Sequence, residues 1–128
     1  MATQQTYPID KRWSGEIIKD GWAVVPVRFL KCYSRGLGLK PTQAMLVLHL
    51  MACKWDDRSP FPSVARLAAE TGLSGGQVRA HIRELERKGI LQRNYRTGQT
   101  TEFDMTGLIE KLEACAASGF AEYAKDVD

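Results

Sequence analysis

A mainly helical domain of the α+β class, with several helices and a single β-hairpin, is the fold that this sequence predicts. Residues 62–91 hold two short capped helices around a turn glycine, the period-two pattern of a hairpin follows them, and helical periodicity fills most of the remainder. The length of 128 residues suits one domain, and 44% apolar and 26% charged residues are ordinary for a globular protein. This composition excludes collagen, mucin and coiled-coil classes.

The amino-terminal region is polar, and we expect residues 1–20 to be loosely ordered and residues 21–128 to form the single domain. It lacks the apolar core of a secretory signal, which favours a cytoplasmic, nucleoid-associated protein. The longest apolar stretch, residues 44–53, reaches about half the length of a membrane span, so we expect no membrane segment. The run WAVVPV at 22–27 contains Pro26, which cannot donate to a strand ladder, so it is either a short edge strand or an extended lead-in.

Two helices are expected before residue 60. The first, VRFLKCYSR, spans about two turns and stops at Gly36 and Gly38. The second follows Thr42 as its N-cap and runs through QAMLVLHLMACKW, whose apolar residues on all sides predict burial of most of its circumference. We expect His49 to be a hydrogen-bonded core histidine, and the prolines of DDRSPFP to end the helix.

The segment PSVARLAAETGLSGGQVRAHIRELERKGIL is the most informative part of the chain. Ser63 is placed to cap a short helix that ends at Gly72, a residue that adopts positive φ at little cost. The apolar positions of this helix have a helical spacing: Val64, Leu67 and Ala68.

A second helix follows after a sharp turn. Ser74 and Gln77 have the spacing of a capping box at its start, and Gly89 closes it. Its buried face is expected at Val78, Ile82 and Leu85. Two short helices joined by a glycine-containing turn form the helix-turn-helix pattern.

The outer face of the second helix is suited to DNA. Its small first residues allow close approach to a surface, and its amino-terminal amides can hold a phosphate. Gln77 and Arg79 suit bidentate contacts to purine edges, whereas Arg83 and Arg87 suit backbone phosphates. Residues 74–96 hold six basic and two acidic residues in a chain of net charge +3, and residues 105–128 are acidic. The alternative is a solvated basic helix face without a partner.

A β-hairpin is expected within ILQRNYRTGQTTEFDM. Residues alternate at period two on both sides of a turn at 96–99, with Gly98 at the positive-φ position. The alternating residues are Leu91, Arg93, Tyr95, Thr101 and Phe103. With Arg96 at its tip and Arg93 on its flank, the hairpin can lie along phosphates or in the minor groove as a wing. The alternative is a hairpin that only covers the core.

A final helix is expected to open at Asp104, because Phe103 and Leu108 have the spacing of a hydrophobic staple. Its apolar stripe continues for up to four turns through Leu108, Ile109, Leu112, Cys115 and Ala116, then Phe120 and Tyr123. Such a stripe needs a covering surface. The helix either folds back on its own domain or pairs with a second copy, and we expect a homodimer.

The chain resembles the winged helix-turn-helix proteins of bacteria, plasmids and phages over residues 21–113, on the string from GWAVVPVRF to ERKGIL and the later FDMTGLIEKLE. That group includes small regulators and the amino-terminal domains of replication initiation proteins. The resemblance implies a winged helix-turn-helix with a β-hairpin wing and extra amino- and carboxy-terminal helices, and a double-stranded DNA partner. Gly75 and Gly76 depart from the longer polar side chains often found there.

The predicted function is sequence-specific binding of double-stranded DNA, with helix 75–88 in the major groove and wing 91–104 on phosphates or the minor groove. The DNA-binding residues are predicted to be Ser63, Ser74, Gly76, Gln77, Arg79, Ala80, Arg83, Arg87, Arg93, Arg96, Thr97 and Gln99. Three uses are open: a transcriptional regulator of a prokaryote or mobile element, a plasmid or phage replication or partition factor, and a winged helix that contacts only proteins. A regulatory or replication protein is an expected partner under the first two.

An enzyme is not expected. The chain has no H-E-x-x-H, and RGLGLKP lacks the phosphate-loop pattern, so we expect neither a metal nor another cofactor. Cys32, Cys53 and Cys115 are far apart in sequence and include no C-x-x-C pair. We expect three reduced, mostly buried thiols.

Overall fold

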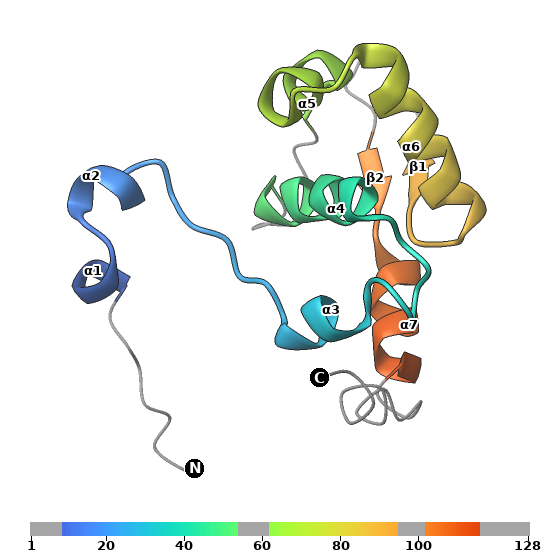
Figure 1. Cartoon of the computed structure of the whole chain (residues 1–128), viewed down its shortest axis with the longest axis horizontal. Coiled ribbons are helices and arrows are strands. Elements are labelled where there is room, and N and C mark those ends of the chain that lie inside the picture. Colours follow the sequence, from blue (N-terminus) through green and yellow to red (C-terminus); the bar gives the residue numbers. More distant parts are fainter. Residues whose placement is uncertain (1–8, 54–61, 95–101, 116–128) are drawn as a thin grey trace, which may run out of the picture.

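A computed structural model describes residues 9–53, 62–94 and 102–115 of the chain. Within these residues the chain is mostly helical, with one two-stranded antiparallel sheet, which confirms the predicted class (Figure 1). The elements are α1 (Ile9–Arg12), α2 (Gly15–Ile18), α3 (Val27–Cys32), α4 (Pro41–Cys53), α5 (Val64–Thr71), α6 (Gly75–Arg87), β1 (Gln92–Asn94), β2 (Glu102–Asp104) and α7 (Thr106–Cys115).

The amino-terminal part lies to one side of the helical body in Figure 1, where α1 and α2 contact each other. Ser14 caps α2 by accepting a hydrogen bond from the backbone of Ile17 at 3.3 Å. Residues 21–26 have no regular secondary structure and connect α2 to α3. Of the two alternatives for this segment, the extended lead-in is therefore the observed one.

Helix α3 ends as expected at a glycine-rich loop. The amides of Gly36 and Leu37 both donate to the carbonyl of Cys32, and Gly38 has φ +69°. The start of α4 differs from the expectation, because Pro41 rather than Thr42 opens the helix. Proline at the first helical position loses no hydrogen bond, and the side chain of Gln43 reaches back to accept from the Lys40 amide at 3.1 Å.

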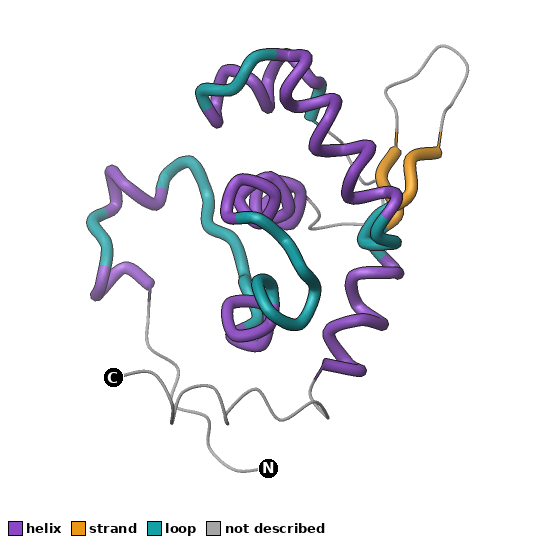
Figure 2. Tube along the Cα trace, turned by 45° about the vertical axis from the view of Figure 1, so that its right-hand side comes forward, coloured by secondary structure: helices purple, strands orange, loops and turns teal. Residues whose placement is uncertain are grey.

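Helix α4 lies at the centre of the fold and packs against both α5 and α6. In Figure 2 it is seen nearly along its axis, with α5 and α6 above it. Its buried side chains are Gln43, Ala44, Leu46, Val47 and Leu50. Met45 is half exposed, so burial covers most but not all of the helix. His49 is hydrogen-bonded, as expected, but it lies at the edge of the core, with Nδ1 3.2 Å from Oε1 of Glu70.

The core also draws on α3 and on α5, α6, β2 and α7. It joins Phe29 and Cys32 of α3 to Leu67 of α5, and the buried face of α6 consists, as predicted, of Val78, Ile82 and Leu85. Ile90, Leu91, Phe103, Met105, Leu108 and Leu112 complete it at the base of the hairpin and on α7. Of the segment DDRSPFP, only Pro62 lies within the described residues, and it is buried.

The predicted hairpin is confirmed. Strands β1 and β2 pair in the register Gln92 to Asp104, Arg93 to Phe103 and Asn94 to Glu102. Arg93 and Phe103 therefore face the same side, as the period-two pattern requires. The turn at 96–99, with Gly98 and the flanking Tyr95 and Thr101, lies outside the described residues.

The last helix begins later than the staple pattern indicated. Asp104 belongs to β2, and its Oδ1 accepts hydrogen bonds from the amide of Thr106 at 2.9 Å and from its hydroxyl at 2.6 Å. This local Asp–Thr bonding favours a turn at 104–106, and α7 starts only at Thr106. Gly107 lies against the loop after α6, where a Cβ atom would be 2.0 Å from the carbonyl oxygen of Gly89.

Helix α7 packs on α3 of the same chain, so the fold-back alternative is the one observed. Its buried face consists of Leu108, Leu112 and Cys115. Ile109 was predicted in this stripe but is 50% exposed, because it lies one residue off the i, i+4, i+7 positions that face α3. Ala116, Phe120 and Tyr123 lie outside the described residues.

Candidate nucleic-acid interface

The unit formed by α5 and α6 has the caps that its sequence predicts. Ser63 Oγ accepts a hydrogen bond from the amide of Arg66 at 3.0 Å, which opens α5. Gly72 closes that helix in the left-handed conformation at φ +77°, and its amide donates to the carbonyl of Ala68. Because Gly72 reverses the chain direction within one residue, α6 can start at Gly75 and pack across α5.

The start of α6 is a full capping box. Ser74 Oγ accepts from the Gln77 amide at 3.1 Å, and Gln77 Oε1 accepts from the Ser74 amide at 2.9 Å. The side-chain oxygen of Gln77 is therefore already engaged. A bidentate contact of Gln77 with adenine needs both its oxygen and its nitrogen, so base reading by this residue requires half of the capping box to open.

The face of α6 opposite the core is exposed and contains the positions singled out from the sequence. Exposed residues on the helix are Gly76, Gln77, Arg79, Ala80, Arg83 and Arg87. Small residues occupy its start and centre, and guanidinium groups occupy the rest. The helix therefore has both room for close approach and positive charge on one surface.

The arginines of this region divide into two kinds. Arg79 and Arg83 make no salt bridge within the part of the chain that the structure describes. Arg66 and Arg87, in contrast, bind a glutamate one turn away on their own helices, Glu70 at 3.1 Å and Glu84 at 3.0 Å. The uncompensated positive charge of α6 is thus concentrated in its middle two turns.

Arg79 folds back over the first turn of its own helix. A Cβ atom at Gly75 would lie 3.4 Å from Nη1 of Arg79 and 3.7 Å from Cγ1 of Val64. The guanidinium therefore lies near the first residue of α5, which follows the cap Ser63. The structure brings Ser63 and Arg79 to the same end of the two-helix unit.

Arg93 has a structural partner that the sequence pattern did not indicate. Its Nη2 lies 2.7 Å from Oε1 of Glu86 on α6, and both side chains are largely buried. The Nε atom donates to the same oxygen at 2.9 Å. Periodicity could not reveal this pair, because it links the flank of a helix to a strand. The pair fixes the hairpin against α6.

Two further polar contacts set α6 against the rest of the fold. Gln43 is almost fully buried, and its Nε2 lies 3.5 Å from Nδ1 of His81 on α6. At the end of α6, the ammonium of Lys88 donates to the carbonyl of Gly38. Sequence analysis missed both contacts, since each joins residues 38 or 50 positions apart.

Residues 37–91 match the family model described as a helix-turn-helix domain. The two helices and the hairpin that follows them have the winged helix-turn-helix fold. A helix-turn-helix domain indicates binding to DNA.

The fold is similar to that in the crystal structure of the N-terminal domain of DnaD protein from Geobacillus kaustophilus HTA426. The two share 24% sequence identity at a TM-score of 0.65, over 87% of this chain and 94% of that chain. At this level of identity the likeness shows a common fold. A comparison with curated protein sequences gives no match.

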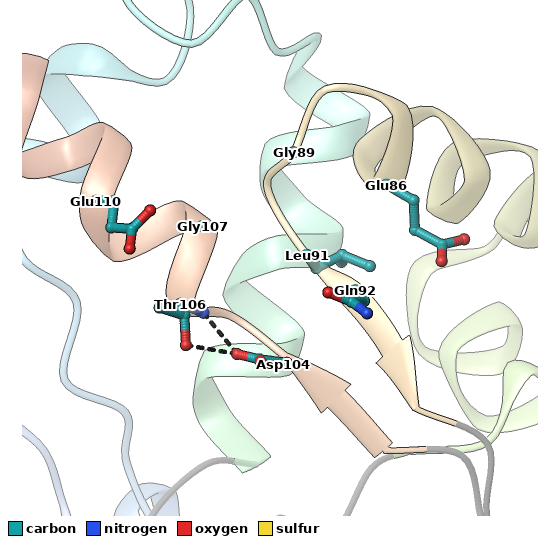
Figure 3. A pocket seen from close by; sticks show the side chains of 8 residues that line it. All are labelled: Glu86, Gly89, Leu91, Gln92, Asp104, Thr106, Gly107 and Glu110. Atoms are coloured by element: carbon teal, nitrogen blue, oxygen red, sulfur yellow. Dashed lines mark hydrogen bonds between the residues drawn. The ribbon is translucent and has the colours of Figure 1, made fainter.

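Acidic side chains line a pocket at the base of the hairpin. A pocket of about 530 Å³ lies between the end of α6, the base of the hairpin and the start of α7 (Figure 3). Its lining includes the carboxylates of Glu86, Asp104 and Glu110. Negative charge at this position disfavours contact with the phosphate backbone.

The remaining predicted site residues, Arg96, Thr97 and Gln99, lie outside the described residues. Within the described ranges, no group of three or more His, Cys, Asp or Glu side chains could hold a metal ion. None of the described helices has the length and apolar character needed to cross a membrane.

Proposed function

We propose that this protein binds double-stranded DNA sequence-specifically, with α6 in the major groove and the hairpin beside the adjacent backbone. The observation that supports this most directly is the pair Arg79 and Arg83 on the exposed face of a capped helix in a helix-turn-helix domain. Charged groups one turn apart and without an acidic partner are available to a polyanion without first breaking a salt bridge.

The contacts are divided between base reading and positioning. Arg79, near the start of α6, is the reader, with Ala80 offering apolar contact to a thymine methyl group. Arg83, together with the caps Ser63 and Ser74, contacts phosphates. Arg87 exchanges Glu84 for a phosphate at small cost, because an exposed ion pair within a helix contributes little to stability.

Arg93 acts on DNA through the wing. Its largely buried pair with Glu86 orients the hairpin, whose tip residues Arg96, Thr97 and Gln99 then make the direct contacts. In this proposal Gln77 keeps the capping box and Gly76 permits the close approach of the helix start. Helix α6 therefore makes few base contacts in this proposal, and the contacts of the wing contribute much of the affinity for DNA.

Transcriptional regulation is the proposed use, and replication or partition is the second candidate. The second is favoured by the resemblance to amino-terminal domains of replication initiation proteins and by the likeness to another amino-terminal domain, that of DnaD protein. Operator geometry separates the two. A regulator is expected to protect a palindrome, and a replication or partition factor is expected to protect direct repeats.

A homodimer remains part of the proposal, on the ground that one recognition helix gives limited specificity against a genome of competing sites. The half-sites would then be about 10 base pairs apart or a multiple of that. The apolar stripe of α7 no longer supports it, because α3 covers that stripe within one chain. Sedimentation with and without operator DNA measures the stoichiometry.

We propose that the protein acts in the cytoplasm on nucleoid or mobile-element DNA.

The deciding experiment is a titration of duplex binding with salt, using Arg83→Gln and Lys111→Gln as a matched pair. Both variants remove one positive charge, but Lys111 is on α7, where its side chain lies beside Gly89. We expect Arg83→Gln to lower the slope of log affinity against log salt by about 0.9. Lys111→Gln is expected to leave the slope unchanged.

Equal slopes in the two variants would contradict the proposed interface. Absence of duplex binding at low salt by the full chain would favour a winged helix that contacts only proteins.

A further inference from the structure

Two of the three cysteines lie together where α3 packs against α7. Cys32 is the last residue of α3 and Cys115 is the last residue of α7, and these helices pack against each other (Figure 1). Both side chains are buried, at 4% and 8% exposure, and their thiols are hydrogen-bonded to each other. Cys53, at the end of α4, is only partly buried.

We propose that Cys32 and Cys115 form a thiol pair that a small-molecule disulfide oxidises to an intrachain disulfide, locking α3 onto α7. The loop closed by this bond contains residues 33–114. It therefore encloses the whole matched helix-turn-helix segment, 37–91, and the hairpin. A cross-link over so long a loop restricts the unfolded chain strongly and stabilises the fold.

The reaction proceeds by two thiol–disulfide exchanges. The thiolate of Cys115 attacks one sulfur of oxidised glutathione and releases one glutathione thiolate, which leaves a mixed disulfide on the protein. The thiolate of Cys32 then attacks the protein sulfur of that mixed disulfide and releases the second glutathione. Two electrons pass to the oxidant, and the two thiol protons end on two molecules of reduced glutathione.

The environment of Cys32 makes this exchange slow in the native state. Burial, together with the hydrogen bond that its thiol donates to Cys115, raises the pKa of Cys32 to about 11, and the nearby Arg28 and Lys31 offset only part of this rise. At neutral pH, Cys32 is therefore a thiolate in only a small fraction of the molecules. Cys115 is the expected first site of attack because it is the more exposed residue of the two, at 8% against 4%.

The test exposes the folded full-length chain to oxidised glutathione and analyses it by non-reducing peptide mapping and mass spectrometry. We expect loss of two hydrogens, a single cross-linked peptide pair containing Cys32 and Cys115, and a melting temperature higher by on the order of 10 °C. Cys53→Ser should keep the cross-link. Cys32→Ala and Cys115→Ala should each abolish it and the rise in melting temperature.

Three outcomes would overturn the proposal. One is a cross-link that contains Cys53, and another is a glutathione adduct on Cys115 that Cys32 never displaces. The third is a native chain whose thiols all stay reduced under conditions that oxidise the urea-unfolded chain. If an alanine variant does not fold, the peptide map of the unsubstituted protein decides alone. None of these results depends on DNA binding.

Discussion

The helix-turn-helix unit, which consists of α5 and α6, and the packed pair α3 and α7 are stabilised in different ways. In the first, each helix has a side-chain cap at its start, Ser63 for α5 and Ser74 for α6, and the turn uses one left-handed glycine. In the second, α3 has no side-chain cap, and its Cys32 meets α7 some eighty residues later in the chain. Local hydrogen bonds set the ends of α5 and α6, whereas burial of residues far apart in the sequence holds α3 against α7.

The difference matters because the two regions are exposed to different demands. The face of α6 that we propose binds DNA is exposed, so on that side the helix is stabilised by its caps rather than by burial. The opposite face of α6 contributes buried side chains to the common core, and so do α3 and α7. Substitutions in the two regions should therefore differ in both size and type of effect.

The largest effect is expected from Phe29→Ala in α3. Phe29 is fully buried and stacks on Tyr33, with ring centroids 5.9 Å apart. Removing it should lower the free energy of unfolding by about 3–5 kcal/mol. Leu30→Ala on the same helix, at a half-exposed position, should cost less than about 1 kcal/mol. Urea unfolding of both variants measures the contrast, and a small loss for Phe29→Ala would make α3 an appendage rather than part of the core.

The next effect compares two glycines at the second position of their helices. A Cβ atom on Gly107 of α7 would overlap the Gly89 carbonyl, whereas one on Gly76 of α6 would meet only Ser74 Oγ at 3.9 Å. Gly107→Ala should therefore destabilise by about 1–3 kcal/mol or more. Gly76→Ala should be neutral or stabilising, because alanine favours the helix by up to about 1 kcal/mol. Thermal unfolding of the two variants should show opposite signs, and equal signs would contradict the close approach at Gly107.

Arg79→Ala tests the DNA-facing unit through function rather than stability. It should weaken binding to a duplex selected for tight binding by about 1–3 kcal/mol, with little change on random duplex, because a base contact contributes only where the base is right. Arg87→Ala, on the same helix but paired with Glu84, should cause a small loss on both DNAs. A fluorescence titration with the two duplexes measures the ratio. Equal losses for Arg79→Ala would assign that residue to the backbone.

The helix-turn-helix unit was largely predictable because its information is local. Ser63, Gly72, Ser74 and Gln77 each act within four residues of their position, and the structure places all four as expected. The hairpin was predictable for the same reason, since alternation at period two indicates which side chains share a face.

Errors arose where two local solutions compete. Pro41 and Thr42 both suit a helix start, and the buried side chain of Gln43 decided between them by capping Lys40. Asp104 has the properties of an N-cap, but pairing with Gln92 in the sheet kept it in a strand. A side chain within the helix settled the first boundary, and pairing with a neighbouring strand settled the second.

The contacts that a sequence pattern could not supply are the tertiary polar ones. Glu86 with Arg93 and Gln43 with His81 each depend on how whole elements are placed. The choice between self-packing and dimerisation of α7 was open for the same reason: an apolar stripe indicates that a surface is covered, but not by which partner.

A smaller effect should come from the caps. Ser74→Ala removes the hydroxyl that accepts from Gln77, and it should lower the free energy of unfolding by about 1 kcal/mol. Ser63→Ala, which removes a single cap bond on α5, should cost no more than that. Ser74→Thr keeps the acceptor and should retain most of the stability. If neither alanine variant changes the urea midpoint, local capping does not stabilise this unit.

The smallest expected effect is on acid sensitivity, and it separates a carboxylate that bonds to side chains of two helices from one that bonds within a single helix. The hydrogen bond from Arg66, aided by His49 on α4, holds the pKa of Glu70 below its ordinary value of 4.5, and Arg87 does the same for Glu84 within α6. A lowered carboxyl pKa gives stability that is present above the unfolded value and is lost as the pH falls through the folded value. The melting temperatures of Glu70→Gln and of the unsubstituted protein should therefore differ at pH 6 and converge by about pH 3, below the ordinary carboxyl pKa.

Glu84→Gln should show a smaller difference at pH 6, because Glu84 bonds only within its own helix while Glu70 also joins α5 to α4. A constant difference for Glu70→Gln from pH 6 to pH 3 would show that its carboxylate charge contributes nothing to the packing of α5 on α4.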